Sequence, residues 1–401
     1  MHFLALIIAT LIPLVTLYII YSLDLYRTGA FRIVLVCFVW GGLAFAAASF
    51  INRFIYNQGW IPLLQRLGMS ETRSKLFIDG ITVDFVRRYV APVTEEILKA
   101  LVLIYLVRRR NFTYFVDGAI YGFSVGIGFA IFENYQYILG NLGMGLGTAL
   151  GRVLSANLIH ASASALVGVA LGLARFRRSL GHIFLLTLGL LLAMLLHSLF
   201  NNLVTRVTSG LLFLYSIVIG LGGAGLIVLL IRRGLSEEKT WIEETLGVAD
   251  RVTSGEAKVV HRLEDVDEIL TPLAERFGAE KAAQIEEFLV VQARLGILRK
   301  TLEKLNDDRM KKGVEQQMAE LRTQMDQARR AVGAYSMLYL RHIFPEESSP
   351  LWGRLESLIK ERAAARPVSG GANLWATLGQ RTAKPAPADN NVNDSTSNKE
   401  N

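Results

Sequence analysis

Long runs of hydrophobic residues, separated by short polar segments, fill the first 235 positions of the chain. A helix needs about 20 apolar residues to cross a bilayer, and the runs have about this length. They lie at residues 3–23, 31–51, 89–107, 119–139, 153–173, 183–204 and 210–231. Between residues 53 and 80, apolar and basic residues are interleaved, which is typical of an interfacial amphipathic segment. We therefore predict an all-α fold, a polytopic transmembrane bundle of about seven helices over residues 1–235.

A different pattern begins after residue 235, where hydrophobic residues recur at intervals of three and four, the heptad spacing of packed helices. This pattern breaks between Asn306 and Gly313 and fits either a helical hairpin or a short coiled coil between protomers, which would form a homo-oligomer. We predict a soluble helical region over residues 236–365. After it, few large apolar residues remain, so we expect a disordered tail over residues 366–401. The heptad positions are Val291, Leu295, Leu298, Leu302 and Leu305, and then Val314, Met318, Leu321 and Met325.

The composition also favours a membrane protein. Of the 401 residues, 52% are hydrophobic and 19% are charged, and the mean hydropathy of +0.35 is high for a soluble enzyme. The net charge of +8 does not indicate a nucleic-acid partner, because many Lys and Arg residues adjoin the apolar spans, where the bilayer explains them. Cys37, the single cysteine, lies in an apolar run, which excludes a disulfide framework and a thiol nucleophile.

The distribution of arginines predicts the orientation. Loops on the cytoplasmic side of a membrane are enriched in Lys and Arg. We therefore place the amino terminus outside and the carboxyl terminus in the cytoplasm, although the loop after the second span also carries basic residues. The arginines on the predicted cytoplasmic side are Arg27, Arg32, Arg108 to Arg110, Arg175, Arg177, Arg178, Arg232 and Arg233.

Three ionisable residues interrupt the third apolar run. Glu95, Glu96 and Lys99 lie in the sequence Ala-Pro-Val-Thr-Glu-Glu-Ile-Leu-Lys. On a helix Lys99 is within one turn of both glutamates. A charge in hydrocarbon costs at least a few kcal/mol, so such residues usually face a protein interior or water and mark a functional site. A structural ion pair between helices is the alternative.

Further polar residues lie at a similar depth in the later spans. Glu133 and Asn134 are near the end of one span, His160 near the start of the next, and His197 with Asn201 near the end of another. Because successive spans run in opposite directions, Glu95, Glu133, His160 and His197 are all predicted about 10 Å below one membrane face. Under the predicted orientation this is the outer face. The spacing predicts one buried polar layer.

These motifs resemble those of the PrsW-type glutamic intramembrane proteases, relatives of the CAAX prenyl endopeptidases and the Abi membrane proteins. The resemblance covers residues 80–204. It implies cleavage of membrane-anchored proteins, such as anti-sigma factors, in the inner membrane of a bacterium. The motifs are Glu-Glu-x-x-Lys at Glu95 to Lys99, Asp-Gly-x-x-Tyr-Gly at Asp117 to Gly122, Gly-Phe-Ala-x-x-Glu-Asn at Gly128 to Asn134, and the later His160 and His197.

Hydrolysis requires a base to activate water and a donor to stabilise the developing oxyanion. We expect Glu95 or Glu96 to be the base and His197 with Asn201 to supply the donor. His160 and Glu133 would orient water and move protons, with Lys99 and Asn134 in supporting positions. Two carboxylates and two histidines can also bind zinc. Since the sequence lacks a His-Glu-x-x-His helix, we expect no metal cofactor and keep zinc as the alternative.

Other functions fit parts of the pattern. Ser124 lies in a Gly-x-Ser-x-Gly sequence, but a nucleophile elbow needs a strand-turn-helix context, whereas this segment is a predicted helix in which Gly122 and Gly126 pack against a neighbour. The carboxylates and histidines could instead form the proton or ion relay of a transporter, although we find no internal repeat. A CAAX-type endopeptidase and a membrane scaffold without catalysis are the remaining alternatives.

Overall fold

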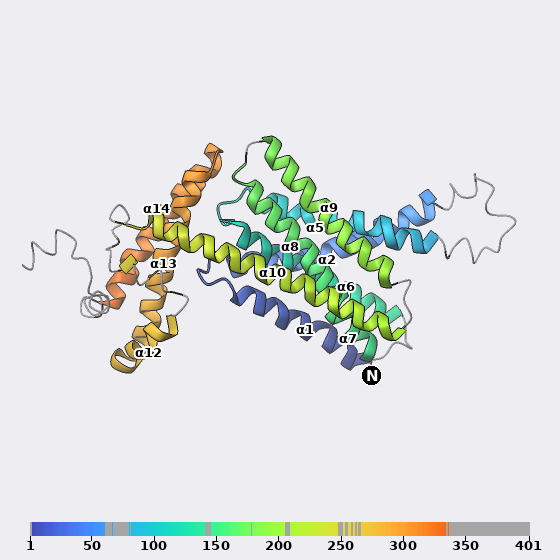
Figure 1. Cartoon of the computed structure of the whole chain (residues 1–401), viewed down its shortest axis with the longest axis horizontal. Helices are drawn as coiled ribbons and strands as arrows, with labels where there is room; N and C mark the ends of the chain where they lie inside the picture. The colour runs from blue at the N-terminus through green and yellow to red at the C-terminus, as the bar shows by residue number, and fades with distance from the viewer. Residues whose placement is uncertain are drawn as a thin grey trace, which may run out of the picture. The chain divides into compact units, whose positions relative to one another are not determined.

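The computed structural model of the protein describes residues 2–60, 82–140, 146–177, 179–204, 209–247 and 266–333, with residues 66, 80, 252, 256, 257, 260, 263 and 336 between or beyond them. Every element in these residues is helical, as predicted (Figure 1). The α-helices are α1 (His2–Ser22), α2 (Phe31–Phe54), α5 (Ala91–Leu106), α6 (Phe115–Gly140), α7 (Leu146–Leu154), α8 (Ala156–Ala174), α9 (Ser179–Val204), α10 (Ser209–Thr245), α12 (Val266–Phe277), α13 (Ala279–Lys304) and α14 (Asp308–Val332). Two short π-helices, η1 (Ile55–Trp60) and η2 (Val86–Val90), continue α2 and precede α5.

Six helices in the described part of the chain are long and apolar enough to cross a membrane. They correspond to six of the seven predicted spans. The remaining predicted span, the third along the chain, corresponds to α5, which has 16 residues and carries three charged side chains. Its length and composition separate it from the other six spans. Because α5 packs against α2, α6, α8 and α9, it belongs to the same bundle. Most of the predicted interfacial segment, residues 53–80, lies outside the described residues, but its start continues α2 as η1.

Helix α6 is at the centre of the bundle, and glycines allow its close approach to α8 and α2. A Cβ atom on Gly122 would lie 2.2 Å from the Ser164 carbonyl oxygen, and one on Gly126 would lie 2.3 Å from the His160 carbonyl oxygen. On the other side, a Cβ on Gly128 would lie 2.0 Å from the Phe38 carbonyl oxygen. Only glycine fits at such backbone crossings, which confirms the predicted packing role of Gly122 and Gly126.

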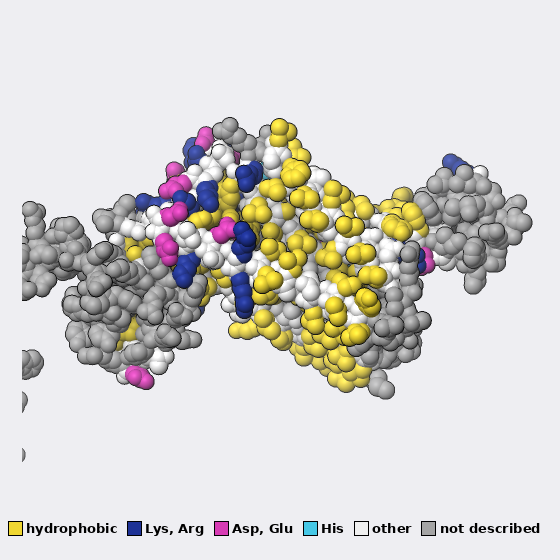
Figure 2. Space-filling model, viewed as in Figure 1, with side chains coloured by type: hydrophobic (Ala, Val, Ile, Leu, Met, Phe, Trp, Pro, Cys, Tyr) yellow, Lys and Arg dark blue, Asp and Glu magenta, His cyan; other side chains and the backbone are white. Residues whose placement is uncertain are grey.

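The outer surface of the bundle is apolar. Figure 2 shows hydrophobic side chains over the visible faces of these helices, with Lys and Arg side chains gathered along one end of the apolar surface. Phe3, Tyr18 and Leu180 are among the large residues exposed there. Soluble proteins rarely expose apolar areas of this extent, so the surface fits contact with lipid.

The two heptad stripes form a hairpin within one chain. Helices α13 and α14 are separated by three residues and pack against each other, and all the heptad positions are buried except the half-buried Leu302. This hairpin within one chain is one of the two predicted arrangements, and a coiled coil between protomers stays a prediction. Helix α14 begins at Asp308, where the Asp307 side chain caps it by accepting from the Met310 backbone N–H at 2.9 Å.

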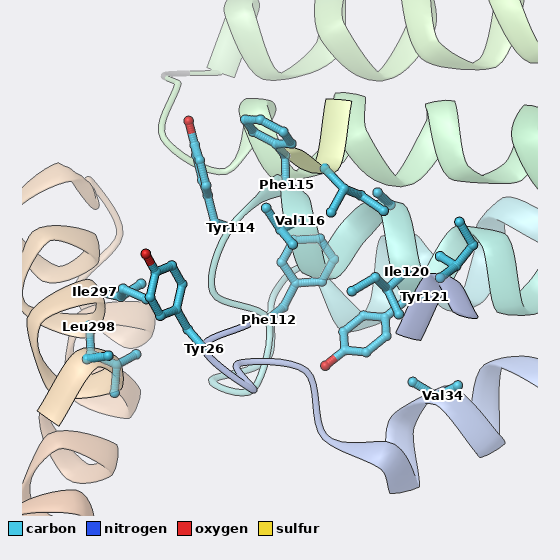
Figure 3. Packing of buried hydrophobic residues seen from close by; sticks show 14 of the residues in the cluster. Tyr26, Val34, Phe112, Tyr114, Phe115, Val116, Ile120, Tyr121, Ile297 and Leu298 are labelled. Carbon is cyan, nitrogen blue, oxygen red and sulfur yellow. The ribbon is translucent and has the colours of Figure 1, made fainter. Parts of the chain in front are cut away.

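The hairpin also packs on the bundle. Tyr26, in the loop between α1 and α2, belongs to the same buried cluster as Ile297 and Leu298 of α13 (Figure 3). An Arg27 nitrogen lies 2.5 Å from a Glu286 oxygen of α13. The domain boundary predicted at residue 235 falls inside the continuous helix α10. The predicted disordered tail lies outside the described residues.

Candidate functional site

The charged residues of α5 point into the bundle. Val86–Val90 forms a π-helix that leads directly into α5, and Pro92 lies in the first turn of α5. Glu96 and Lys99 are fully buried, and Glu95 is only 8% exposed. The Lys99 ammonium lies 3.0 Å from Glu96 Oε1 and 3.9 Å from the centre of the Phe129 ring. Glu96 is therefore the glutamate that the lysine neutralises.

His197 of α9 connects the two glutamates. Its Nδ1 lies 2.9 Å from Glu96 Oε1, and its Nε2 lies 3.9 Å from Glu95 Oε2. A carboxylate paired with Lys99 accepts hydrogen bonds, so Nδ1 carries the ring proton and donates a hydrogen bond to Glu96. The lone pair of Nε2 then faces Glu95. This arrangement of a carboxylate behind a histidine is common around metal-binding and catalytic imidazoles.

His160 of α8 connects Lys99 with Glu133. Its Nδ1 lies 2.8 Å from Lys99 Nζ, and its Nε2 lies 2.9 Å from Glu133 Oε2. Because an ammonium group only donates, Nδ1 accepts from Lys99 and Nε2 donates to Glu133. The rings of His160 and His197 meet edge to face, with centres 4.6 Å apart. The structure thus brings the sequence-predicted glutamates and histidines together in one cluster.

Glu133 belongs to a second group of polar residues that sequence reasoning only partly identified. Arg152 of α7 donates to Glu133 Oε2 at 2.7 Å and to Asn134 Oδ1 at 2.8 Å. Asn134 in turn donates to Asn157 Oδ1 at 2.7 Å. The sequence does not single out Arg152 as a site residue, because a basic residue near the end of a span indicates topology. Asn157 lies one helical turn before His160, and this spacing was the signal that could have identified it.

A single non-helical residue separates α7, which carries Arg152, from α8. Ser155 has φ −126° and ψ −81°, outside the helical region, and its hydroxyl donates to the Gly151 carbonyl at 2.6 Å. Arg152 lies on α7, before this residue, and His160 lies on α8, after it. The Arg152 guanidinium also lies over the Tyr137 ring, 3.8 Å from its centre.

Asn201 lies on the same helix as His197, and its amide is already engaged. Its Nδ2 donates to the Arg87 carbonyl in η2 at 2.9 Å. Ser198 donates to the neighbouring Arg88 carbonyl at 2.7 Å. These bonds satisfy carbonyl groups of the π-helix and join α9 to the segment that leads into α5. Asn201 therefore holds the two helices that carry Glu95, Glu96 and His197 against each other.

The Asp-Gly-x-x-Tyr-Gly motif stabilises the opposite end of α6. Asp117 accepts from the Thr113 backbone N–H at 2.6 Å and from the Thr28 hydroxyl at 2.8 Å. The hydroxyl of Tyr121 donates to the Asn111 carbonyl at 3.2 Å. These contacts join the start of α6 to the loop before α2, so the motif is structural in this chain. Ser124 is likewise engaged, since its buried hydroxyl donates to the Val34 carbonyl at 2.7 Å, which gives the serine-protease alternative no support.

Three side chains of the cluster can hold a metal ion. One ligand atom each from Glu95, His160 and His197 lies within 4.8 Å of the other two. Glu95 Oε2 is buried and has no hydrogen-bond partner in the described residues. An unpartnered buried carboxylate oxygen facing a histidine lone pair is costly unless a cation or water occupies the space. Two imidazoles and one carboxylate form a ligand set that zinc accepts in catalytic sites.

Comparisons with known proteins agree with these motifs. "Protease PrsW" of Bacillus subtilis (strain 168) is 32% identical over 133 residues, which cover 33% of this chain and 60% of the relative. "Protease PrsW" of Halalkalibacterium halodurans is 34% identical over 120 residues, 30% of this chain and 54% of the relative. The protein of that name from Clostridioides difficile (strain 630) is 40% identical over 79 residues, 20% of this chain and 32% of the relative. The chain thus spans less than two thirds of the length of these curated relatives, and no solved structure matches it.

The family model described as PrsW family intramembrane metalloprotease matches residues 29–230. This range is just over half of the chain and contains every residue of the buried cluster. It begins before α2 and ends within α10, so it covers four of the six long apolar helices completely and a fifth in part. The chain belongs to the PrsW family of intramembrane metalloproteases.

Proposed function

We propose that the protein is an endopeptidase that hydrolyses peptide bonds of membrane-anchored proteins at the buried cluster of α5, α6, α8 and α9. One observation carries the proposal: ligand atoms of Glu95, His160 and His197 converge from three helices to within 4.8 Å, beside a carboxylate oxygen that has no partner in the described residues. A packing role needs no such convergence, because buried polar groups in a packed core pair with each other.

We further propose that Glu95, His160 and His197 hold zinc, with one ring nitrogen of His160 exchanging its present hydrogen bond, to Lys99 or to Glu133, for the metal. The ligand set and the description of the family favour this version over the metal-free reaction expected from the sequence. Bound zinc would supply Lewis-acid chemistry, polarising the peptide carbonyl and making water a better nucleophile. Glu96 supports the site by holding His197 through Nδ1, and Lys99 neutralises Glu96 in the apolar interior.

Glu133 is the proposed proton acceptor. Its Oε2 is 2.9 Å from His160 Nε2, so Glu133 lies beside the ligand cluster without belonging to it. Arg152 holds the carboxylate in place at 2.7 Å and balances its charge. A proton taken from the attacking water can later pass to the leaving amine from the same group, which is the usual double use of a general base. Mutation of Glu133 is therefore expected to abolish cleavage while leaving metal binding intact.

The proposed substrates are single-pass or otherwise membrane-anchored proteins, including regulators of the anti-sigma-factor type. The cluster lies among helices whose outer faces are apolar, so a substrate segment has to reach it from the lipid phase or from the nearest membrane surface. We propose the cytoplasmic membrane of a bacterium as the location, with the carboxyl terminus in the cytoplasm, on the strength of the arginine-rich ends.

The test compares the membrane proteomes of cells that express the wild-type chain, Glu95→Gln or Ser124→Ala. Full-length membrane-anchored substrates should accumulate only with Glu95→Gln, because Ser124 serves packing. In parallel, the zinc content of the purified proteins is measured by elemental analysis. Glu95→Gln should bind less zinc and Glu133→Gln should bind as much as the wild type. Identical proteomes in all three strains would contradict the peptidase, and cleavage that survives complete removal of metal would contradict the zinc site.

A further inference from the structure

A cavity of about 930 Å³ lies at the ends of α5, α8 and α14, and no residue of the buried cluster lines it. Its lining is strongly cationic, with five arginines and one carboxylate. These residues are Arg108, Arg109, Arg175, Arg177, Arg309 and Asp307. Under the predicted orientation, this end of the bundle faces the cytoplasm. An excess of positive charge around a partly open cavity favours an anionic ligand.

Arg175 is the strongest sign of a built site. The residue is only 3% exposed. One nitrogen, Nη1, donates to the Val107 carbonyl at 2.5 Å and to the Arg109 carbonyl at 3.1 Å. The other two nitrogens, Nε and Nη2, are buried and lack a hydrogen-bond partner in the described residues. Arg175 lines the cavity, its guanidinium is held in place by two backbone carbonyls, and it has no ion pair in the described residues, so it adds a fixed, uncompensated positive charge there.

The surrounding charges do not neutralise one another. Arg108, Arg177 and Arg309 are exposed, and none has an ion pair in the part of the chain that the structure describes. Asp307 is occupied as the N-terminal cap of α14, where it accepts from the Met310 backbone N–H. The site therefore keeps several guanidinium groups available for one anion, contributed by the bundle and by the hairpin.

The other wall of the cavity is apolar. Leu101 and Tyr105 of α5 and Ile183 of α9 line it and are 45%, 56% and 59% exposed. Both helices belong to the bundle, and α9 is one of the six candidate spans. A free phosphate ion would use only the arginines, whereas a phospholipid would also place an acyl chain along these exposed side chains. Basic pockets between membrane helices on the cytoplasmic side commonly bind anionic headgroups.

We propose that this cavity binds the phosphate headgroup of an anionic phospholipid from the cytoplasmic leaflet. Its acyl chains would lie against α5 and α9, and its phosphate would bridge Arg175 of the bundle with Arg309 of α14. A bound lipid would then join the α13–α14 hairpin to the membrane bundle. Asn306 already makes such a connection, since its amide donates to the Phe176 carbonyl at 3.0 Å.

The experiment uses the full chain in nanodiscs of phosphatidylcholine with increasing fractions of phosphatidylglycerol, and native mass spectrometry counts the retained phosphatidylglycerol. The site variant is Arg108→Gln with Arg309→Gln. The matched control is Arg32→Gln with Arg232→Gln, which removes the same charge from exposed residues at the same predicted side, outside the cavity. At about 1 kcal/mol for each arginine near the headgroups, we expect about 30-fold weaker retention in the site variant and wild-type retention in the control. Equal losses in both variants would overturn the proposal.

Two further measurements do not depend on a variant. Phosphatidylglycerol carrying a photoreactive acyl chain should label the wild-type chain in the segment from Leu101 to Arg109 and near Ile183, and even labelling of all lipid-exposed helices would contradict a specific site. Inorganic phosphate added to protein in phosphatidylcholine should not raise the melting temperature. If phosphate alone stabilises the protein as much as phosphatidylglycerol does, the cavity binds free phosphate and the lipid proposal is wrong.

Discussion

Lys99 is the residue whose removal gives the most direct test of the buried cluster. Its side chain is 1% exposed, and its ammonium contacts Glu96 at 3.0 Å, His160 at 2.8 Å and the face of Phe129 at 3.9 Å. Lys99→Met keeps the length and the apolar stem of the side chain but removes the charge. Glu96 then keeps only its hydrogen bond from His197 and stays fully buried.

The expected cost follows from the charge that remains behind. Breaking a buried ion pair by removing one partner destabilises proteins by about 3–5 kcal/mol, because the other charge stays uncompensated. The free energy of unfolding should fall by this amount, which changes the folding equilibrium constant by about two to four powers of ten. The double variant Lys99→Met with Glu96→Gln removes both charges, and the amide oxygen that the second substitution introduces can still accept from His197. We therefore expect the double variant to regain at least half of the lost stability.

The assay is equilibrium unfolding in mixed detergent micelles, with the abundance of each variant in membranes as a second readout. Lys312→Met is the control, since Lys312 is exposed on α14 and has no ion pair in the described residues, so its replacement should change stability by less than about 0.5 kcal/mol. The interpretation of Lys99 as the counterion of Glu96 is refuted if Lys99→Met is as stable as the control, or if the double variant is less stable than Lys99→Met.

Three other predictions follow from the packing, the loop before α2 and the topology. Gly126→Ala should lower stability by about 1–3 kcal/mol in thermal melts and impair cleavage, because the added Cβ would lie 2.3 Å from the His160 carbonyl oxygen. Gly140→Ala is the control and should be neutral, because a Cβ at Gly140 would have no atom within 4 Å. Burial, together with repulsion from Asp117, raises the pKa of Asp24 to about 7. The folded state therefore keeps a proton that the unfolded chain releases near pH 4, so stability should fall as the pH rises from about 4 to about 7, and melts of Asp24→Asn should show a shallower slope than the wild type. Reporter fusions after residue 143 and after Arg233 should report opposite compartments, and a common compartment would contradict the seven-span interpretation.

The sequence was sufficient to predict the helices and the depth of the polar residues. Apolar runs long enough to cross a bilayer admit few structures besides helices, since every backbone polar group must be paired inside the segment. Once the spans are placed, the rise of a helix assigns each polar residue a depth. The contacts of Glu133 with His160 and of Glu95 with His197 are consistent with this one-dimensional calculation. Depth alone, however, says nothing about which helices are neighbours.

The parts of the site that could not be predicted depend on lateral packing. Arg152 of α7 pairs with Glu133 of α6, a contact between two helices, and α7 ends at the non-helical Ser155, which no periodicity in the sequence marks. The engagement of Asn201 with the η2 backbone depends on a π-helix, which has no sequence signature. Both features arise from contacts between helices that are distant in the sequence.

The two adjacent glutamates show most clearly what the structure adds. Neighbouring residues on an α-helix point about 100° apart, so Glu95 and Glu96 cannot share one environment. Glu96 faces Lys99 and the protonated nitrogen of His197, contacts that balance its charge and leave it a positioning role. Glu95 has no ion pair in the described residues closer than its 3.9 Å contact with the unprotonated nitrogen of His197, although the Oε2 atom of each glutamate lacks a hydrogen-bond partner there. An electrophile or a proton can therefore be bound at Glu95 without breaking a close ion pair. Because of this difference, Glu95→Gln should abolish cleavage, whereas Glu96→Gln should mainly misplace His197.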